Sequence, residues 1–167
     1  VQGLYHLQDL ENMENATQQG LTRAVIVGGG LIGIEMAEMF HSRHIPVTFL
    51  VREDSFWNAV LPAEESEMIN KHILNNGIDL RLNEELQEIK GLDGNVSSIV
   101  CKNSGEEIEC EFVGLTVGVS PNIDFIKSSG IAINRGIVVD EYLRTSANDV
   151  YALGDCVELS KPNPGRR

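Results

Sequence analysis

The fold is decided by the stretch Val25-Ile26-Val27-Gly28-Gly29-Gly30-Leu31-Ile32-Gly33. A short apolar strand over 23–27 runs into a glycine turn, and the turn opens a helix expected over 31–43. A second strand follows over 47–51 and is apolar except at Thr48, as in a parallel sheet covered on both faces. A strand, a helix and a strand within about 30 residues predict a right-handed βαβ unit.

The spacing of the glycines gives this turn a chemical meaning. Gly28, Gly30 and Gly33 form the pattern GxGxxG, which in a strand-turn-helix context predicts a dinucleotide-binding turn. Gly28 permits the tight turn, Gly30 lets the backbone approach a pyrophosphate, and Gly33 lets the helix pack closely on the strand. The helix N-terminus adds N–H groups and a positive dipole. The expected pyrophosphate site comprises Gly28, Gly29, Gly30, Leu31, Ile32 and Gly33. A glycine-rich turn without a ligand is the alternative.

The end of the second strand bears on which dinucleotide would bind. An acidic residue usually stands there and accepts hydrogen bonds from the ribose hydroxyls. Here the strand end reads Val51-Arg52-Glu53-Asp54, which puts Val51 at the expected acidic position. Arg52 is either a contact for a 2′-phosphate or a solvated surface charge, and Glu53 can reach a ribose if the strand end bends. Because two acids stand beside Arg52, we expect discrimination between NADH and NADPH to stay within about tenfold.

Further along, the chain repeats the strand-helix-strand pattern and then changes character. A helix beginning at Pro62 and ending at Asn76-Gly77 leads into a strand over 78–82. Strands are then expected over 86–92, 95–102 and 107–113, with hairpin signals at Asp93-Gly94 and Ser104-Gly105. The predicted fold class is α/β, a Rossmann-like dinucleotide-binding domain with a parallel sheet, helices and a three-stranded antiparallel excursion.

The turn at Ser104-Gly105 predicts how the strands over 95–102 and 107–113 pair in the second hairpin. A two-residue loop at Ser104-Gly105 sets Cys101 opposite Ile108 and Ile99 opposite Cys110, so that these four residues share one apolar face. The two cysteines are then diagonal neighbours, and no disulfide is expected. The other expected elements are a weak helix around 7–13, a strand ending at 115–118, a short helix over 123–128, and short strands over 136–140 and 150–153.

Composition excludes several classes of protein. The 167 residues carry 13 Lys and Arg against 25 Asp and Glu, a net charge of −12, which argues against binding to nucleic acid or to anionic membranes. No apolar run approaches the length of about 20 residues that spans a bilayer, and no signal peptide is visible. The three cysteines form no CxxC pair and are typical of reduced thiols in a cytoplasmic protein.

His41 and His44 lie near no third ligand, so we expect no metal site.

Three segments together resemble a known family. Residues 25–38 are similar to the nicotinamide-binding segment of the pyridine nucleotide-disulfide oxidoreductases. Residues 116–122 resemble that family's glycine-bearing turn, and residues 140–156 resemble its second flavin motif. The order of the motifs fits the family as well. The resemblance is greatest to the branch of NADH oxidases, CoA-disulfide reductases, nitrite reductases and ferredoxin or rubredoxin reductases.

The resemblance implies a cofactor pair and further site residues. The parent protein would bind FAD and NAD or NADP, and this chain would position the nicotinamide for hydride transfer to flavin N5. Glu35 corresponds to a carboxylate near the nicotinamide, or else is a plain helix-surface residue. Asp155 corresponds to the acceptor of a hydrogen bond from the ribityl chain, or else is a turn residue. Gly118 and Gly154 belong to the two cofactor-binding turns. The branch uses NADH widely, and Asn58 stands where NADPH-dependent relatives usually carry a second Arg, which favours NADH slightly.

The resemblance also implies how the chain is divided into domains, and it leaves other functions open. The family's first flavin motif and redox cysteine have no counterpart in the sequence, and the chain begins with Val1. We expect 1–20 to connect from the flavin domain, 21–118 to bind NAD(P), and 119–167 to return to the flavin domain of the same parent, which can be homodimeric. A non-catalytic dinucleotide sensor is the alternative function. A short-chain dehydrogenase would need Tyr-x-x-x-Lys, and Tyr5, Tyr142 and Tyr151 lack that Lys.

Overall fold

The computed structural model describes residues 1–160 and divides into two compact units. The first unit is Val1–Gly118, and the second begins at Val119. Each unit has its own hydrophobic core and is described by itself. Within residues 1–160, no helix has the length and hydropathy needed to cross a bilayer.

The first unit is built on a four-stranded parallel sheet. Its strands are β1 (Ala24–Val27), β2 (Val47–Val51), β3 (Asp79–Leu82) and β7 (Phe112–Leu115), in the order β3-β2-β1-β7. Every residue of β1 and β2 is buried, which explains why both strands are apolar except at Thr48, whose hydroxyl donates a hydrogen bond to the Asp79 carboxylate. The expected βαβ unit and the second crossover are both confirmed.

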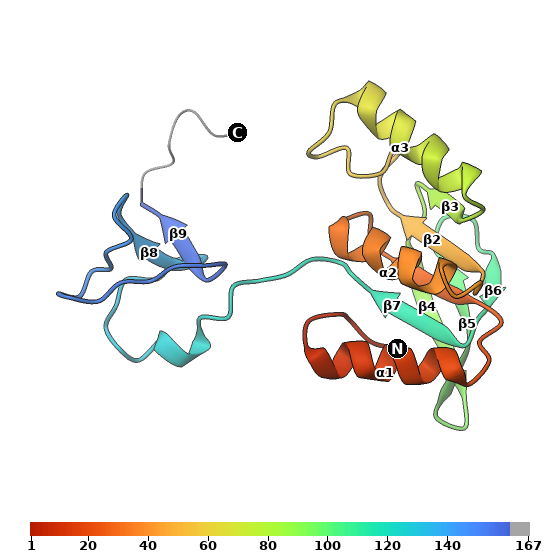
Figure 1. Cartoon of the computed structure of the whole chain (residues 1–167), viewed down its shortest axis with the longest axis horizontal. Coiled ribbons are helices and arrows are strands. Elements are labelled where there is room, and N and C mark those ends of the chain that lie inside the picture. Colours follow the sequence, from red (N-terminus) through yellow and green to blue (C-terminus); the bar gives the residue numbers. More distant parts are fainter. Residues whose placement is uncertain (161–167) are drawn as a thin grey trace. The chain divides into compact units, whose positions relative to one another are not determined.

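Three helices cover one face of this sheet (Figure 1): α1 (Leu7–Gln18), α2 (Leu31–His41) and α3 (Ala63–Asn75). Their buried side chains include Met13, Met36 and Phe40, and they share a core with Ala24 and Ile26 of β1. The alternate residues of β1, Val25 and Val27, point into a second core on the opposite face of the sheet. The parallel sheet is therefore the middle of three layers.

The third layer is a three-stranded antiparallel sheet made of β4 (Leu86–Leu92), β5 (Asn95–Cys101) and β6 (Glu107–Glu109). Its buried face carries Ile99, Cys101, Ile108 and Cys110, as the sequence predicted. The predicted register was wrong by two residues, because Ile99 pairs with Ile108. The loop is longer than two residues, since the carboxylate of Glu84 accepts hydrogen bonds from the N–H groups of Asn103 and Ser104 and holds the turn open. A shift of two preserves the faces, and so the burial was predicted correctly.

The strand expected over 107–113 is in fact two strands in different sheets. β6 ends at Glu109, and β7 begins at Phe112 in the parallel sheet. Between them, the Glu111 carboxylate accepts hydrogen bonds from the N–H groups of Thr22 (2.9 Å) and Arg23 (3.1 Å) and from the Thr22 hydroxyl (2.6 Å). These bonds fix the chain where it passes from one sheet to the other.

The second unit is small and has little regular structure. Over residues 119–160 it contains one 3-10 helix, η1 (Asp124–Ile126), and a parallel pair of strands, β8 (Ile137–Val139) and β9 (Val157–Leu159). The prediction of a strand over 150–153 is wrong, because Tyr151 forms only an isolated bridge with Arg144. Positive φ angles at Asp149 and Gly154 bend the chain on either side of that segment, and the second strand forms later, as β9.

The contrast between two glycines gives a stability prediction. A Cβ on Gly33 would lie 2.3 Å from the Gly28 carbonyl oxygen, whereas a Cβ on Gly30 would meet nothing within 4 Å. We therefore expect Gly33→Ala to lower the free energy of unfolding by about 3 kcal/mol, the upper end for overpacking. Gly30→Ala should cost less than about 1 kcal/mol, the difference between N-cap residues. Urea denaturation followed by circular dichroism measures both variants, and equal costs would contradict the packing described.

Candidate functional site

A cleft of about 540 Å³ lies at the carboxyl ends of the parallel strands. It follows the ends of β1, β2 and β7 and the turn after β3. Its walls are formed by Val27, Gly28, Gly29, Gly30, Leu50, Arg52, Glu53, Trp57, Asn58, Ala59, Glu84, Glu85, Leu86, Leu115, Thr116, Val117 and Gly118. This edge is where open α/β sheets bind ligands, and the volume is typical of small-molecule sites.

The glycine turn forms the floor of the cleft. Gly28 has a φ of 120°, and a Cβ there would lie 2.4 Å from the carbonyl oxygen of Thr116. Gly33 packs against Gly28 and the Thr116 side chain, whose hydroxyl donates a hydrogen bond to the Val27 carbonyl at 2.9 Å. Gly30 alone of these three glycines faces open space. Two glycines thus permit close packing, and the third leaves room for a ligand.

The first turn of α2 opens beside this glycine turn. Its N-cap is Gly30, in an extended conformation, and no side chain caps the helix there. The first N–H groups of a helix have no intrahelical partner. Leu31 is 52% exposed, so the beginning of the helix is accessible to solvent. Such a helix end attracts an anion by its dipole and its free N–H groups.

The residues at the end of β2 do not all line the cleft, although their sequence had suggested that they would. Val51 does not line the cleft, because its side chain is fully buried, and a Cβ on Gly29 would lie 2.7 Å from Val51 Cγ1. Arg52 and Glu53 do line it, and they form an ion pair with Nε and Oε1 2.7 Å apart. The hydrogen bond from Arg52 to Glu53 raises the pKa of the guanidinium. The Arg52 side chain is 74% exposed, so this charge is accessible but already paired.

The end of β7 closes the other side. Gly118 has a φ of 118°, a conformation that favours glycine. The Tyr5 hydroxyl donates a hydrogen bond to the Gly118 carbonyl at 3.3 Å, which ties the N-terminal segment to this turn. Gln2 lies in the same segment and forms a parallel bridge with Gly114 of β7. Because β1 pairs with the other edge of β7, the strand is held on both edges where it reaches the cleft.

Comparisons with known proteins agree with this geometry. Residues 1–166 match the pyridine nucleotide-disulphide oxidoreductase family. The chain belongs to this family. The resemblance drawn from the three sequence motifs is therefore confirmed.

Relatives and solved structures describe the family further. A nitric oxide reductase FlRd-NAD(+) reductase from Salmonella agona is 35% identical over 83% of this chain and 36% of its own length. A ferredoxin reductase for the CYP199A2 system from Rhodopseudomonas palustris is 26% identical with a TM-score of 0.88, over 95% of this chain and 39% of that one. An NAD-dependent persulfide reductase from A. fulgidus is 29% identical with a TM-score of 0.86, over 93% of this chain and 29% of that one. The chain thus spans between 29% and 39% of the length of these three proteins.

The lining of the cleft does not include Leu31, Ile32 or Gly33 of the predicted pyrophosphate site, and it does not include three further residues that the family motifs suggested. Glu35 is an exposed residue of α2 and does not line it. Gly154, with a φ of 90°, and Asp155 form an exposed turn of the second unit, just before β9. Cys156 follows and donates a thiol hydrogen bond to the Leu153 carbonyl at 3.4 Å. Their roles stay predictions.

The structure adds cleft residues that the sequence did not reveal. Glu84 is 8% exposed, and its carboxylate accepts hydrogen bonds from the N–H groups of Glu85 (3.1 Å), Asn103 (2.8 Å) and Ser104 (3.1 Å). Burial alone would raise the pKa of Glu84, but these hydrogen bonds outweigh it, and the pKa is lowered. Thr116 and Trp57 were also missed. The position of Glu84 just past a parallel strand was the one available signal.

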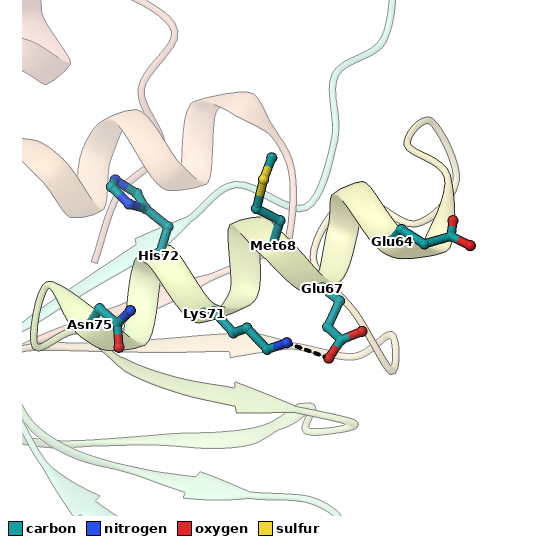
Figure 2. Close-up of a pocket in the computed structure, with 6 residues that line it drawn as sticks. All are labelled: Glu64, Glu67, Met68, Lys71, His72 and Asn75. Atoms are coloured by element: carbon teal, nitrogen blue, oxygen red, sulfur yellow. Dashed lines mark ion pairs between the residues drawn. The ribbon is translucent and has the colours of Figure 1, made fainter.

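A second hollow, of about 400 Å³, lies on α3. Its six lining residues all come from this helix: Glu64, Glu67, Met68, Lys71, His72 and Asn75. Figure 2 shows their side chains spreading away from the helix, with Lys71 and Glu67 joined by an ion pair of 2.7 Å. The groups do not converge on a common point, and so we assign no site to this surface. Among residues 1–160, no group of three or more His, Cys, Asp or Glu side chains is placed to hold a metal ion.

Glu84 yields a pH-dependent prediction. Its pKa in the folded chain is lowered below the unfolded value of about 4.3, so its stabilising effect is present above that pH and lost as pH falls through the folded value. We expect Glu84→Gln to cost about 1–2 kcal/mol at neutral pH, because hydrogen bonds to a charged acceptor are lost. The difference from wild type should shrink below pH ~4. Urea denaturation across pH tests this, with the exposed Glu109→Gln as the control. A difference independent of pH would contradict it.

Proposed function

We propose that this chain is the NAD(P)H-binding part of an FAD-dependent oxidoreductase and that the cleft takes the dinucleotide. The observation that carries the proposal is the contrast at the glycine turn. Gly28 and Gly33 are pressed against protein atoms, whereas Gly30 faces open space at an uncapped helix N-terminus. That arrangement suits a pyrophosphate, which needs close approach of the backbone and free N–H donors.

The strand order suggests how the dinucleotide lies. β1 carries the glycine turn and stands between β2 and β7. We place the pyrophosphate at the turn, the adenosine toward Arg52 and Glu53 after β2, and the nicotinamide toward Thr116 and Gly118 after β7. The cleft extends in both directions from the turn, as an elongated ligand requires.

The chemistry belongs to the parent protein. A bound nicotinamide supplies a hydride to the flavin, and the residues of this chain bind and orient it. We propose that Glu35 provides a carboxylate near the nicotinamide and that Gly154 and Asp155 contact the flavin. The sequence holds one strand-turn-helix glycine motif, so the rest of the flavin site would come from other parts of the parent. Residues 1–20 and 119–167 would then link this part to the flavin domain.

The names of the relatives favour NAD. The Salmonella relative is called an FlRd-NAD(+) reductase, and the A. fulgidus structure is called NAD-dependent. For this chain we propose NADH with a slight preference over NADPH.

The three free cysteines are typical of a reducing compartment, and we place the parent in the cytoplasm on that ground.

The phosphate site is tested at Gly30. Gly30→Val adds a branched side chain where the structure has open space, so the fold should survive while the affinity for NAD⁺ falls at least about tenfold. Titration calorimetry of the chain measures this, and thermal denaturation checks the fold. Met68→Val, which puts the same side chain on the exposed face of α3, is the control. Unchanged affinity in Gly30→Val would show that the turn is not the phosphate site.

Cofactor preference is tested at Arg52. The guanidinium is already paired with Glu53, so a 2′-phosphate would gain less than the ~1.5–3 kcal/mol of a full charge-assisted contact. We expect wild-type affinities for NADH and NADPH to agree within about tenfold, or ~1.4 kcal/mol, and Arg52→Ala to weaken NADPH alone. Lys71→Ala is the matched control, because Lys71 is similarly exposed and paired with a glutamate outside the cleft. A hundredfold preference in wild type would refute the expectation.

A further inference from the structure

Trp57 has a backbone conformation that the proposed function leaves unexplained. It lies in the loop between β2 and α3, and its φ is 53°, in the left-handed region. For a bulky aromatic residue this is a true outlier, and such residues are concentrated at ligand-binding and catalytic sites. Trp57 also lines the cleft, together with Asn58 and Ala59.

The loop holds Trp57 firmly in this conformation. The preceding residue, Phe56, is 3% exposed, and its N–H donates a hydrogen bond to the Asn70 side chain of α3 at 2.9 Å. The Trp57 carbonyl accepts hydrogen bonds from the N–H groups of Val60 and Leu61, both at 3.0 Å. The indole also packs against the Phe56 ring, with centroids 6.4 Å apart. The backbone is therefore held on both sides of Trp57, and the half-buried indole itself packs against the core under the helices.

We propose that Trp57 is a binding residue for the adenine ring of the dinucleotide, on whose face the base stacks. This inference rests on the proposed function, because it needs the cleft to be the dinucleotide site. The sheet order supports the adenine end: Trp57 follows β2, whereas the nicotinamide end lies beyond β7 on the other side of β1. Leu86 and Ala59 line the same cleft and add apolar surface for a base. A ring that is fixed before binding loses little conformational entropy when a base stacks on it.

The fluorescence of the chain reports on this residue directly. Trp57 is the one tryptophan in the 167 residues, so its emission carries no contribution from another indole. We expect ADP-ribose, which carries the adenine half, to quench the emission in a saturable way. Nicotinamide mononucleotide, which carries the other half, should leave it unchanged. Quenching by the mononucleotide and not by ADP-ribose would overturn the assignment to adenine.

Substitution separates the ring from the backbone strain. Trp57→Gly removes the indole and suits a positive φ, so the fold should persist while the affinity for ADP-ribose falls about tenfold, or ~1.4 kcal/mol. Trp57→Phe keeps an aromatic face and should stay within about threefold of wild type. Val60→Ala is the matched control, because Val60 is an exposed apolar residue of the same loop and does not line the cleft. Calorimetry gives the affinities, and thermal denaturation checks each fold.

The outcomes distinguish this inference from the function on which it rests. If wild type binds NAD⁺ and Trp57→Gly binds ADP-ribose within about twofold of wild type, the stacking role is refuted and the dinucleotide site stands. If wild type binds neither NAD⁺ nor ADP-ribose, both proposals fall. A tenfold loss in Trp57→Gly with retention in Trp57→Phe supports the assignment when both variants keep the thermal stability of wild type, because a purely structural role would appear as a loss of stability.

Discussion

The close contact between Gly33 of α2 and the carbonyl of Gly28 is the constraint on which the first unit depends. No side chain fits between them, since a Cβ on Gly33 would also lie 2.8 Å from the Thr116 hydroxyl and 3.1 Å from the Phe49 ring. Thr116 reinforces the point, because both its N–H and its hydroxyl donate to the Val27 carbonyl. The helix, the central strand and β7 thus meet at one place, and the start of α2 opens directly into the cleft.

The burial of the sheet on both faces then decides where a ligand can enter. Ala24 and Ile26 belong to the core under the helices, while Val25 and Val27 belong to the core against the antiparallel sheet. With both faces covered, the strand ends are where the sheet remains open. The carboxyl ends are also where the turns carry polar groups and helix N-termini. The location of the cleft is therefore a consequence of the three layers and not a separate feature.

Much of this architecture could be predicted from sequence because its signals are local. The βαβ unit depends on nearly continuous apolar runs and on glycine spacing, and both signals lie within neighbouring residues. The errors arose where a distant side chain decides the backbone. The register of the β5–β6 hairpin depends on Glu84, which precedes the turn by about twenty residues and binds its N–H groups. The break between β6 and β7 depends on Glu111 binding Thr22 and Arg23, far back in the chain. The burial of Val51 beneath Gly29 also needed three-dimensional packing to be seen.

The charges of the cleft indicate which contacts can hold an anionic dinucleotide. Its lining contains one cation, Arg52, and three carboxylates, Glu53, Glu84 and Glu85. Each of these carboxylates already has a partner: Glu53 pairs with Arg52, Glu84 accepts N–H groups, and Glu85 pairs with Lys102 at 3.1 Å. With no unpaired cation among the lining residues, a pyrophosphate would rely on neutral donors, the free N–H groups and dipole at the start of α2. Affinity would then depend strongly on the close approach that Gly30 permits and on apolar contact with the bases. Arg52, which is exposed and already paired, adds little to the close approach or to the apolar contact. The 2′-phosphate that distinguishes NADPH from NADH should therefore change the affinity less than the loss of the Trp57 ring against the adenine.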